Sequence, residues 1–243
     1  MSLIVTLYVP EGMVMAGDSR LTLDWTTKTK AGIEMHSVPS SDSNTKIFSM
    51  GKRFGLGTFG AADIQGIPIS GFISQFTEEK MTDETTIDQM PELLIDFFGR
   101  EHGYPATDFY VIGYKVEEGI STPHAYHVDI AQKKFERINY EDETVNGAEW
   151  GGQTDVLTRL LSTVKIKKRG LWIDQPFTPI PWNYMTLQDA IDFATYAVRT
   201  TIETIRFQQK EKTVGGPIDI LVLRPNEEPL WISKKVFKAQ STA

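Results

Sequence analysis

The first twenty residues constrain the fold most, because they are typical of two short strands joined by a tight turn. From Leu3 to Val9 the odd-numbered and even-numbered positions are both apolar or neutral. A strand with two such faces is covered on both sides in the folded protein. Pro10-Glu11-Gly12 supplies the turn residues, and Met13 to Gly17 form the returning strand.

A small polar cluster follows this hairpin. Asp18-Ser19-Arg20 comes directly after the second strand, and the hydroxyl residue Ser2 precedes the first strand. Because a hairpin returns the chain to its starting point, we expect Asp18 to lie close to Ser2. This proximity is the first indication of a functional site.

The composition limits the classes of function. The chain has 243 residues, 40% of them hydrophobic, and no domain boundary is visible, so we expect one domain over residues 1–243. The net charge is -7 and the densest basic cluster is the short stretch 165–169, so we expect no nucleic-acid partner. The absence of cysteine excludes disulfides, a thiol nucleophile and a cysteine-based metal site.

Other partners and compartments are judged from short patterns. We expect no signal peptide and no membrane span, because no apolar run approaches the roughly 20 residues needed to cross a bilayer. A cytoplasmic location is the default expectation. His124 and His127 are three apart in a candidate strand and face opposite sides, so we expect no shared metal, and no cofactor is indicated.

The order of elements predicts the fold class. Residues 21–45 show no clear period and are interpreted as an extended loop, with a short hairpin left open, and residues 165–185 are interpreted as irregular. Hairpins outnumber crossovers, and the helices are grouped between blocks of strands, which predicts an α+β fold of mainly antiparallel sheets with helices outside. The expected strands cover 3–9, 13–17, 46–50, 54–59, 108–116, 122–130, 134–138, 218–223 and 230–237. The expected helices cover an irregular segment from 60 to about 75, one from Thr85 or Thr86 to Gly99 or Gly103, 153–164, and one starting at the N-cap Thr186 with Asp189 three residues on.

Several separated motifs then resemble one family. They are Gly17-Asp18-Ser19-Arg20, Lys46 at the start of the next strand, Gly60-Ala61-Ala62-Asp63, Gly151-Gly152 at a helix start, and Gly215-Gly216 before a late strand. Their order and spacing resemble the proteasome-type N-terminal-nucleophile (Ntn) hydrolases, the group of the proteasome β-subunits and the related bacterial peptidase ring. The resemblance covers nearly the whole chain. It implies a four-layer αββα sandwich and a homo-oligomer, with a ring as the family's form, and leaves an ATPase partner open.

The resemblance also implies a catalytic set of Ser2, Asp18, Lys46, Gly60 and Glu211. Ser2 lies sixteen residues before Asp18, at the family's position for the nucleophile, once Met1 has been removed. The α-amine of a first residue has a pKa of about 7.7 to 8.0 and suits a general base. Lys46 would lower that pKa, Asp18 would hold Lys46, and the Gly60 backbone N–H would bind the oxyanion. The reaction that the resemblance implies would be threonine- or serine-type hydrolysis of a peptide or other amide through an acyl-enzyme on Ser2.

The chain departs from the family at three places. Gln153 and Val214 occupy positions where the family has serine, and Glu211 replaces an aspartate. An insertion of about a dozen residues also separates Asp18 from Lys46 relative to the family. These changes alter the polar network around the expected amine.

Plainer interpretations stay open beside this one. A serine at position 2 is common, Gly-Asp-Ser is an ordinary turn, and Asp18 with Arg20 or Lys46 is also explained as a structural ion pair. Gly60 to Asp63 is equally consistent with a helix start. Two alternative functions follow: a non-catalytic ring or scaffold subunit, and an amidase acting on small molecules.

Overall fold

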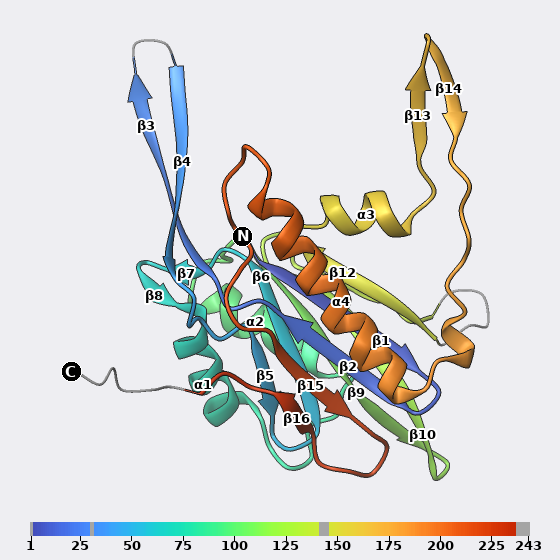
Figure 1. The fold of residues 1–243 in the computed structure, drawn as a ribbon. Coiled ribbons are helices and arrows are strands. Elements are labelled where there is room, and N and C mark those ends of the chain that lie inside the picture. Colours follow the sequence, from blue (N-terminus) through green and yellow to red (C-terminus); the bar gives the residue numbers. More distant parts are fainter. Residues whose placement is uncertain (1, 30–31, 141–145, 237–243) are drawn as a thin grey trace, which may run out of the picture.

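The computed structural model describes residues 2–29, 32–140 and 146–236, which are built around two five-stranded antiparallel sheets (Figure 1). The strands of the first sheet, in spatial order, are β12 (Gly147–Gly152), β1 (Leu3–Val9), β2 (Gly12–Gly17), β15 (Asp219–Leu223) and β16 (Leu230–Ser233). The strands of the second sheet are β11 (Lys134–Arg137), β10 (Ile120–Asp129), β9 (Thr107–Glu117), β6 (Phe54–Gly60) and β5 (Ile47–Met50). The expected α+β class with mainly antiparallel sheets is confirmed.

Strand β1 is covered on both faces, as its sequence predicts. All seven of its residues are buried. Its odd-numbered residues belong to a hydrophobic cluster that includes Ala194 and Val198 of α4 (Leu187–Arg206). Its even-numbered residues Ile4 and Tyr8 belong to a second cluster, shared with strands of the other sheet.

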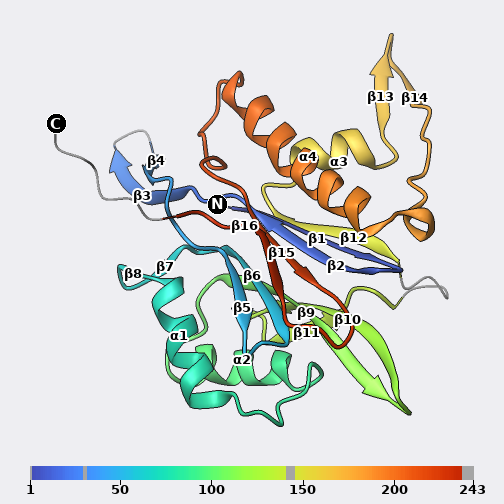
Figure 2. The same ribbon diagram turned by 60° about the horizontal axis from the view of Figure 1, so that its bottom comes forward.

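The helices lie on the outer faces of the two sheets (Figure 2). Helix α4 and α3 (Asp155–Leu161) pack on the first sheet. Helices α1 (Ile69–Lys80) and α2 (Met90–Arg100) pack on the second sheet through a third hydrophobic cluster. Each pair of helices therefore shares a hydrophobic cluster with one sheet, and the cluster around Ile4 and Tyr8 contains residues of both sheets.

Helix α4 begins as the sequence predicts. The Thr186 hydroxyl accepts a hydrogen bond from the Asp189 N–H, and the Asp189 carboxylate accepts one from the Thr186 N–H. This reciprocal capping box satisfies two backbone donors at the helix start. The predicted N-cap is confirmed.

The loop expected over residues 21–45 is a long hairpin, whereas residues 165–185 begin with a short hairpin and are otherwise irregular, as expected, apart from one turn of 3-10 helix. Residues 21–45 contain β3 (Leu21–Thr29) and β4 (Gly32–Ser41), and residues 165–185 contain β13 (Lys165–Lys168), β14 (Leu171–Asp174) and the short 3-10 helix η1 (Trp182–Tyr184). Both hairpins project from the body of the molecule (Figure 1). Since neither is covered as a core strand is, their sequences lack the alternation that marks a half-buried strand.

Several boundaries also differ from the expectation. The segment after Gly60 first forms a small hairpin of β7 (Asp63–Ile64) and β8 (Ile67–Pro68), and α1 begins only after Pro68. Helix α2 begins at Met90 with Pro91 in its first turn, later than the threonines suggested. Helix α3 is shorter than the expected 153–164, and strand β12 was not expected. The last strand, expected over 230–237, ends at Ser233, and Phe237 lies outside the described residues.

None of the helices in the described part of the chain is long and apolar enough to cross a bilayer.

Two histidines on β10 respond to pH in opposite directions. Burial lowers the pKa of His124, with a further contribution from Arg137, while Asp88 opposes the shift. The carboxylate of Asp108, 3.5 Å from His127 Nε2, raises the pKa of that residue. One histidine therefore resists protonation in the folded state and the other favours it.

We expect the His124→Gln variant to lose part of the acid sensitivity of the wild-type protein. Below about pH 6.5 the imidazole of residue 124 binds a proton in the unfolded chain but stays neutral in the folded protein. This group therefore lowers the free energy of unfolding of the wild type on acidification, by at most about 1.4 kcal/mol per pH unit. Urea unfolding at several pH values measures this. His127→Gln is the matched comparison: its wild-type contribution is present below about pH 6.5 and is lost as the pH rises. Parallel curves for wild type and His124→Gln would contradict the assignment.

Candidate functional site

The hairpin of β1 and β2 brings Ser2 and Asp18 to the same end of the first sheet. In the register of the two strands Ile4 lies opposite Gly17, so Asp18 follows opposite Leu3. The Leu3 N–H donates to Asp18 Oδ1 at 3.0 Å, and the Asp18 N–H faces the Leu3 carbonyl oxygen at 3.4 Å. The carboxylate therefore contacts the residue next to Ser2.

Lys46 reaches the same carboxylate from the other sheet. It precedes β5, and its Nζ lies 2.8 Å from Asp18 Oδ1. The Lys46 side chain is 2% exposed and that of Asp18 is fully buried. The Lys46 carbonyl oxygen accepts the Thr58 N–H at 2.9 Å, which holds this segment to β6. The pair joins the two sheets in a place that water does not reach.

Every acceptor position of Asp18 is used. Oδ1 accepts from the Leu3 N–H and from Lys46. Oδ2 accepts from the backbone N–H of Arg20 at 3.1 Å and of Gly215 at 3.0 Å. Four donors from four segments are thus held by one carboxylate, and a buried charge needs this degree of pairing.

The environment lowers the pKa of Lys46. Burial is the largest cause, because it disfavours the ammonium form. The Asp18 carboxylate opposes this shift, while the positive charges of Lys235 and Arg20 add to it. The site therefore holds a lysine that is less basic than a solvated one.

Two glycines shape the surroundings of Ser2. Gly60 ends β6 with φ +93°, and a Cβ there would lie 2.7 Å from the Ala106 carbonyl oxygen. Gly152 has φ +90°, and a Cβ there would lie 1.9 Å from the Ser2 carbonyl oxygen and 3.4 Å from Phe59 Cβ. Since Phe59 precedes Gly60, the end of β6 adjoins the Ser2 backbone. Only glycine fits either position.

Gln153 and Val214, the two positions at which the resemblance leads one to expect serine, belong to segments that contact Ser2 and Asp18. The Gln153 N–H donates to the Ser2 carbonyl oxygen at 2.8 Å, and the Gln153 side chain contacts Asp155 Oδ1 at 2.6 Å. Val214 is buried in the cluster under α4. The neighbouring Thr213 hydroxyl, which sequence reasoning missed, donates to Gln153 Oε1 at 3.2 Å. A buried hydroxyl is therefore present one residue before Val214.

Glu211 stands apart from the other candidates. Its side chain is exposed, and the four hydrogen bonds of the Asp18 carboxylate come from other residues. The structure thus brings Ser2, Asp18, Lys46 and the end of β6 together and does not bring Glu211 to Asp18.

Sequence reasoning also missed a second buried ion pair. Asp219 lies opposite Gly17 in the pairing of β15 with β2. Its carboxylate accepts the Lys235 N–H at 2.8 Å and forms an ion pair with the Lys235 ammonium. Both side chains are buried, and the charge of Lys235 acts on Lys46. The sequence signal was limited to a charged residue near the start of the strand expected over residues 218–223.

Arg20 holds the loop that supplies Gly215. Its guanidinium pairs with both oxygens of Asp42, at 2.6 and 2.8 Å, and donates to the Lys212 carbonyl oxygen at 3.1 Å. A Cβ at Gly215 would lie 2.5 Å from the guanidinium carbon. Arg20 therefore positions the backbone donor that Asp18 requires.

No group of three or more histidine, aspartate or glutamate side chains in the described ranges is placed to hold a metal ion. A scan of the sequence against protein-family models gives no match, and a search of curated proteins gives no relative.

We expect the Asp18→Asn variant to be strongly destabilised. The amide has the size of the carboxylate, but its NH2 group would face N–H donors, and Lys46 would lose its buried counter-charge. Breaking a buried pair in this way costs about 3–5 kcal/mol in the free energy of unfolding. Urea unfolding measures the loss. Asp192→Asn on the exposed face of α4 is the control, with an expected change within about 0.5 kcal/mol. A loss below about 1 kcal/mol for Asp18→Asn would contradict this assignment.

Proposed function

We propose that this chain is an Ntn hydrolase that cleaves a peptide bond or another amide, with Ser2 as its nucleophile. The observation that supports this most is the buried Asp18–Lys46 pair, 2.8 Å apart, beside the backbone of the residue that follows Ser2. Lysine and aspartate in this relation to a terminal hydroxyl residue can tune an N-terminal amine. The proposal includes the four-layer αββα arrangement of this family, which is supported by the three hydrophobic clusters.

The proposed base is the α-amine of Ser2, which requires removal of Met1. Met1 lies outside the described residues. A free amine can accept a proton, whereas an amide nitrogen in a Met1–Ser2 bond cannot. The positive charge of Lys46 disfavours a second positive charge nearby and lowers the pKa of the amine. Asp18 keeps Lys46 in place.

The steps then follow from these groups. Ser2 Oγ attacks the carbonyl carbon of the substrate as its proton passes to the α-amine. The Gly60 N–H stabilises the negative oxygen of the tetrahedral intermediate. The carbon–nitrogen bond breaks, the proton passes to the leaving amine, and an ester on Ser2 remains. Water then attacks the ester and releases the acid, which restores the Ser2 hydroxyl.

A non-catalytic ring or scaffold subunit is the second candidate. It is favoured by the exposed position of Glu211, by the apolar Val214, and by the burial of Ser2, which is 5% exposed. In this case the Asp18–Lys46 pair has only a structural role. A small-molecule amidase is the third candidate and differs from the peptidase only in its substrate.

We expect the protein isolated from cells to begin at Ser2 and to lose activity in the Ser2→Ala variant. Removal of a nucleophile should lower the turnover of a fluorogenic peptide or acyl-amide by at least about 10³-fold. Intact mass spectrometry gives the first residue, and a substrate panel measures turnover. Ser2→Thr should retain activity, because threonine also presents a hydroxyl, and Ser40→Ala on the exposed hairpin is the control.

The outcomes separate the three candidates. Retained Met1 together with no turnover and no labelling by hydroxyl-directed inhibitors would overturn the enzyme proposal and select the scaffold subunit. Turnover of acyl-amides without cleavage of peptides would select the amidase. Full activity in Ser2→Ala would exclude Ser2 as the nucleophile.

A further inference from the structure

The hairpin of β13 and β14, here called the basic arm (residues 165–174), projects from the body with every strand residue exposed (Figure 1). Arg169 and Gly170 connect its strands, and both have positive φ, as the central residues of a type I′ turn require. The Arg169-Gly170 turn therefore defines the end of the arm. A two-stranded hairpin without a core is marginally stable in water.

The chemistry of the basic arm suits a partner surface. Leu171 is 71% exposed and Trp172 is 67% exposed. Ile166 and Ile173 are paired across the strands and are also exposed. Four cations and one carboxylate give the arm a net charge of +3, in a chain whose total is -7. Exposed apolar side chains gathered in one place mark contact sites, and the surrounding cations complement an acidic partner surface.

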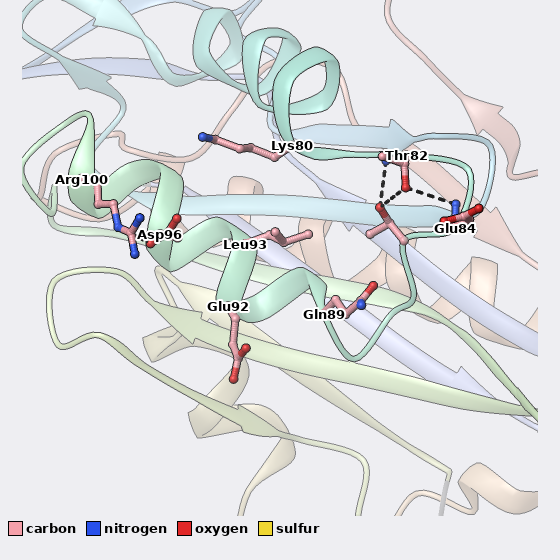
Figure 3. A pocket seen from close by; sticks show the side chains of 9 residues that line it. Lys80, Thr82, Glu84, Gln89, Glu92, Leu93, Asp96 and Arg100 are labelled. Carbon is pink, nitrogen blue, oxygen red and sulfur yellow. Dashed lines mark hydrogen bonds and ion pairs between the residues drawn. The ribbon is translucent and has the colours of Figure 1, made fainter.

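An acidic surface lies on α1, α2 and their connection. Residues 78–101 carry eight carboxylates and only two cations, a net charge of -6. A pocket of about 580 Å³ opens between these helices, here called the acidic groove (Figure 3). Its lining residues include Lys80, Glu84, Glu92, Leu93, Asp96 and Arg100. It therefore combines three carboxylates and two cations, a net charge of -1, with a partly buried leucine.

The charge of the acidic groove is only partly balanced within the chain. Lys80 pairs with Glu101 at 2.9 Å, and Arg100 pairs with Asp96 at 2.6 Å. Among the described residues, Glu84 and Glu92 have no ion pair. Two exposed carboxylates thus remain available to cations from outside.

The basic arm and the acidic groove lie on opposite sides of the molecule. The arm follows α3, which packs on the first sheet, whereas α1 and α2 pack on the second. Both views of the fold show this separation (Figures 1 and 2). Because the arm cannot reach the groove of its own chain, their complementarity applies to two chains.

We propose that the basic arm of one copy of this chain docks into the acidic groove of a second copy. Opposite net charges give the contact its specificity, and Leu171 and Trp172 give it apolar area to bury. Because the arm and the groove are different surfaces, each copy can bind one neighbour through its arm and another through its groove. Such head-to-tail contacts form a closed ring when the last copy meets the first, and an open chain of copies when it does not. The proposal goes beyond the hydrolase function and does not depend on Ser2.

Sedimentation of the purified full chain at several concentrations and salt levels tests the proposal. At about 50 mM salt the mass should exceed the monomer mass of 27.4 kDa, and at about 1 M salt screening should shift it toward the monomer. Lys167→Glu with Lys168→Glu in the arm should weaken self-association at least about tenfold, as should Glu84→Lys with Glu92→Lys in the groove. Lys28→Glu with Lys134→Glu makes the same charge change as the arm variant at other exposed sites and should leave self-association unchanged.

Mixing the arm variant with the groove variant provides the decisive measurement. In the mixture, the acidic arm of the arm variant meets the basic groove of the groove variant, and the native arm of the groove variant meets the native groove of the arm variant. The mixture should therefore associate like the wild type, although neither variant associates alone. Circular dichroism checks that both variants are folded. A wild type that is monomeric at low salt, or a mixture that stays dissociated, would overturn the proposal. Neither result would affect cleavage by Ser2, so the two proposals fail separately.

Discussion

The Asp18 carboxylate is the interaction on which the arrangement of this end of the molecule depends. It accepts hydrogen bonds from the start of β1, from the turn at Arg20 and from the loop at Gly215, and it pairs with Lys46 beside β5. These segments belong to both sheets and are far apart in the chain. The carboxylate is fully buried, so removing it would leave each of its hydrogen-bond donors without a partner. Each unsatisfied buried donor lowers the free energy of unfolding by about 1–3 kcal/mol.

A buried ion pair is a poor device for stability alone. Two charges removed from water lose hydration energy that their attraction often fails to restore, and apolar residues of similar volume stabilise a core at least as well. This end of the molecule nevertheless contains two such pairs, Asp18–Lys46 and Asp219–Lys235. The second pair adds positive charge near Lys46 and lowers its pKa further. The desolvation cost of these two pairs is easier to explain if a neighbouring group, such as the Ser2 amine, needs the positive electrostatic potential that Lys46 and Lys235 create.

The sequence predicts those parts of the fold that are governed by covered faces and caps. Strand β1 and the N-cap of α4 follow from local patterns. Strand β12 could not be found in this way, because three of its six residues are glycine, and it becomes a strand by pairing with β1. In the site, Asp18 and Lys46 could be named from the sequence. The Gly215 N–H could not be identified as a donor to Asp18, since a backbone donor leaves no sequence signal. Glu211 was named from its place in the sequence, but its side chain is exposed in the structure.

The basic arm differs from the buried site, because it forms a hairpin whose strand residues are all exposed. Fixing the backbone of a residue costs about 1–2 kcal/mol in conformational entropy, and most of a domain recovers this by burying apolar surface. The arm instead exposes Leu171 and Trp172 to water. Its internal contacts are modest, such as Lys167 Nζ 5.9 Å from the Trp172 ring and Lys165 3.3 Å from Asp174. Contact with the acidic groove of a second copy would supply the missing burial, and because that groove is formed by α1 and α2, the Asp18 site would keep its own geometry.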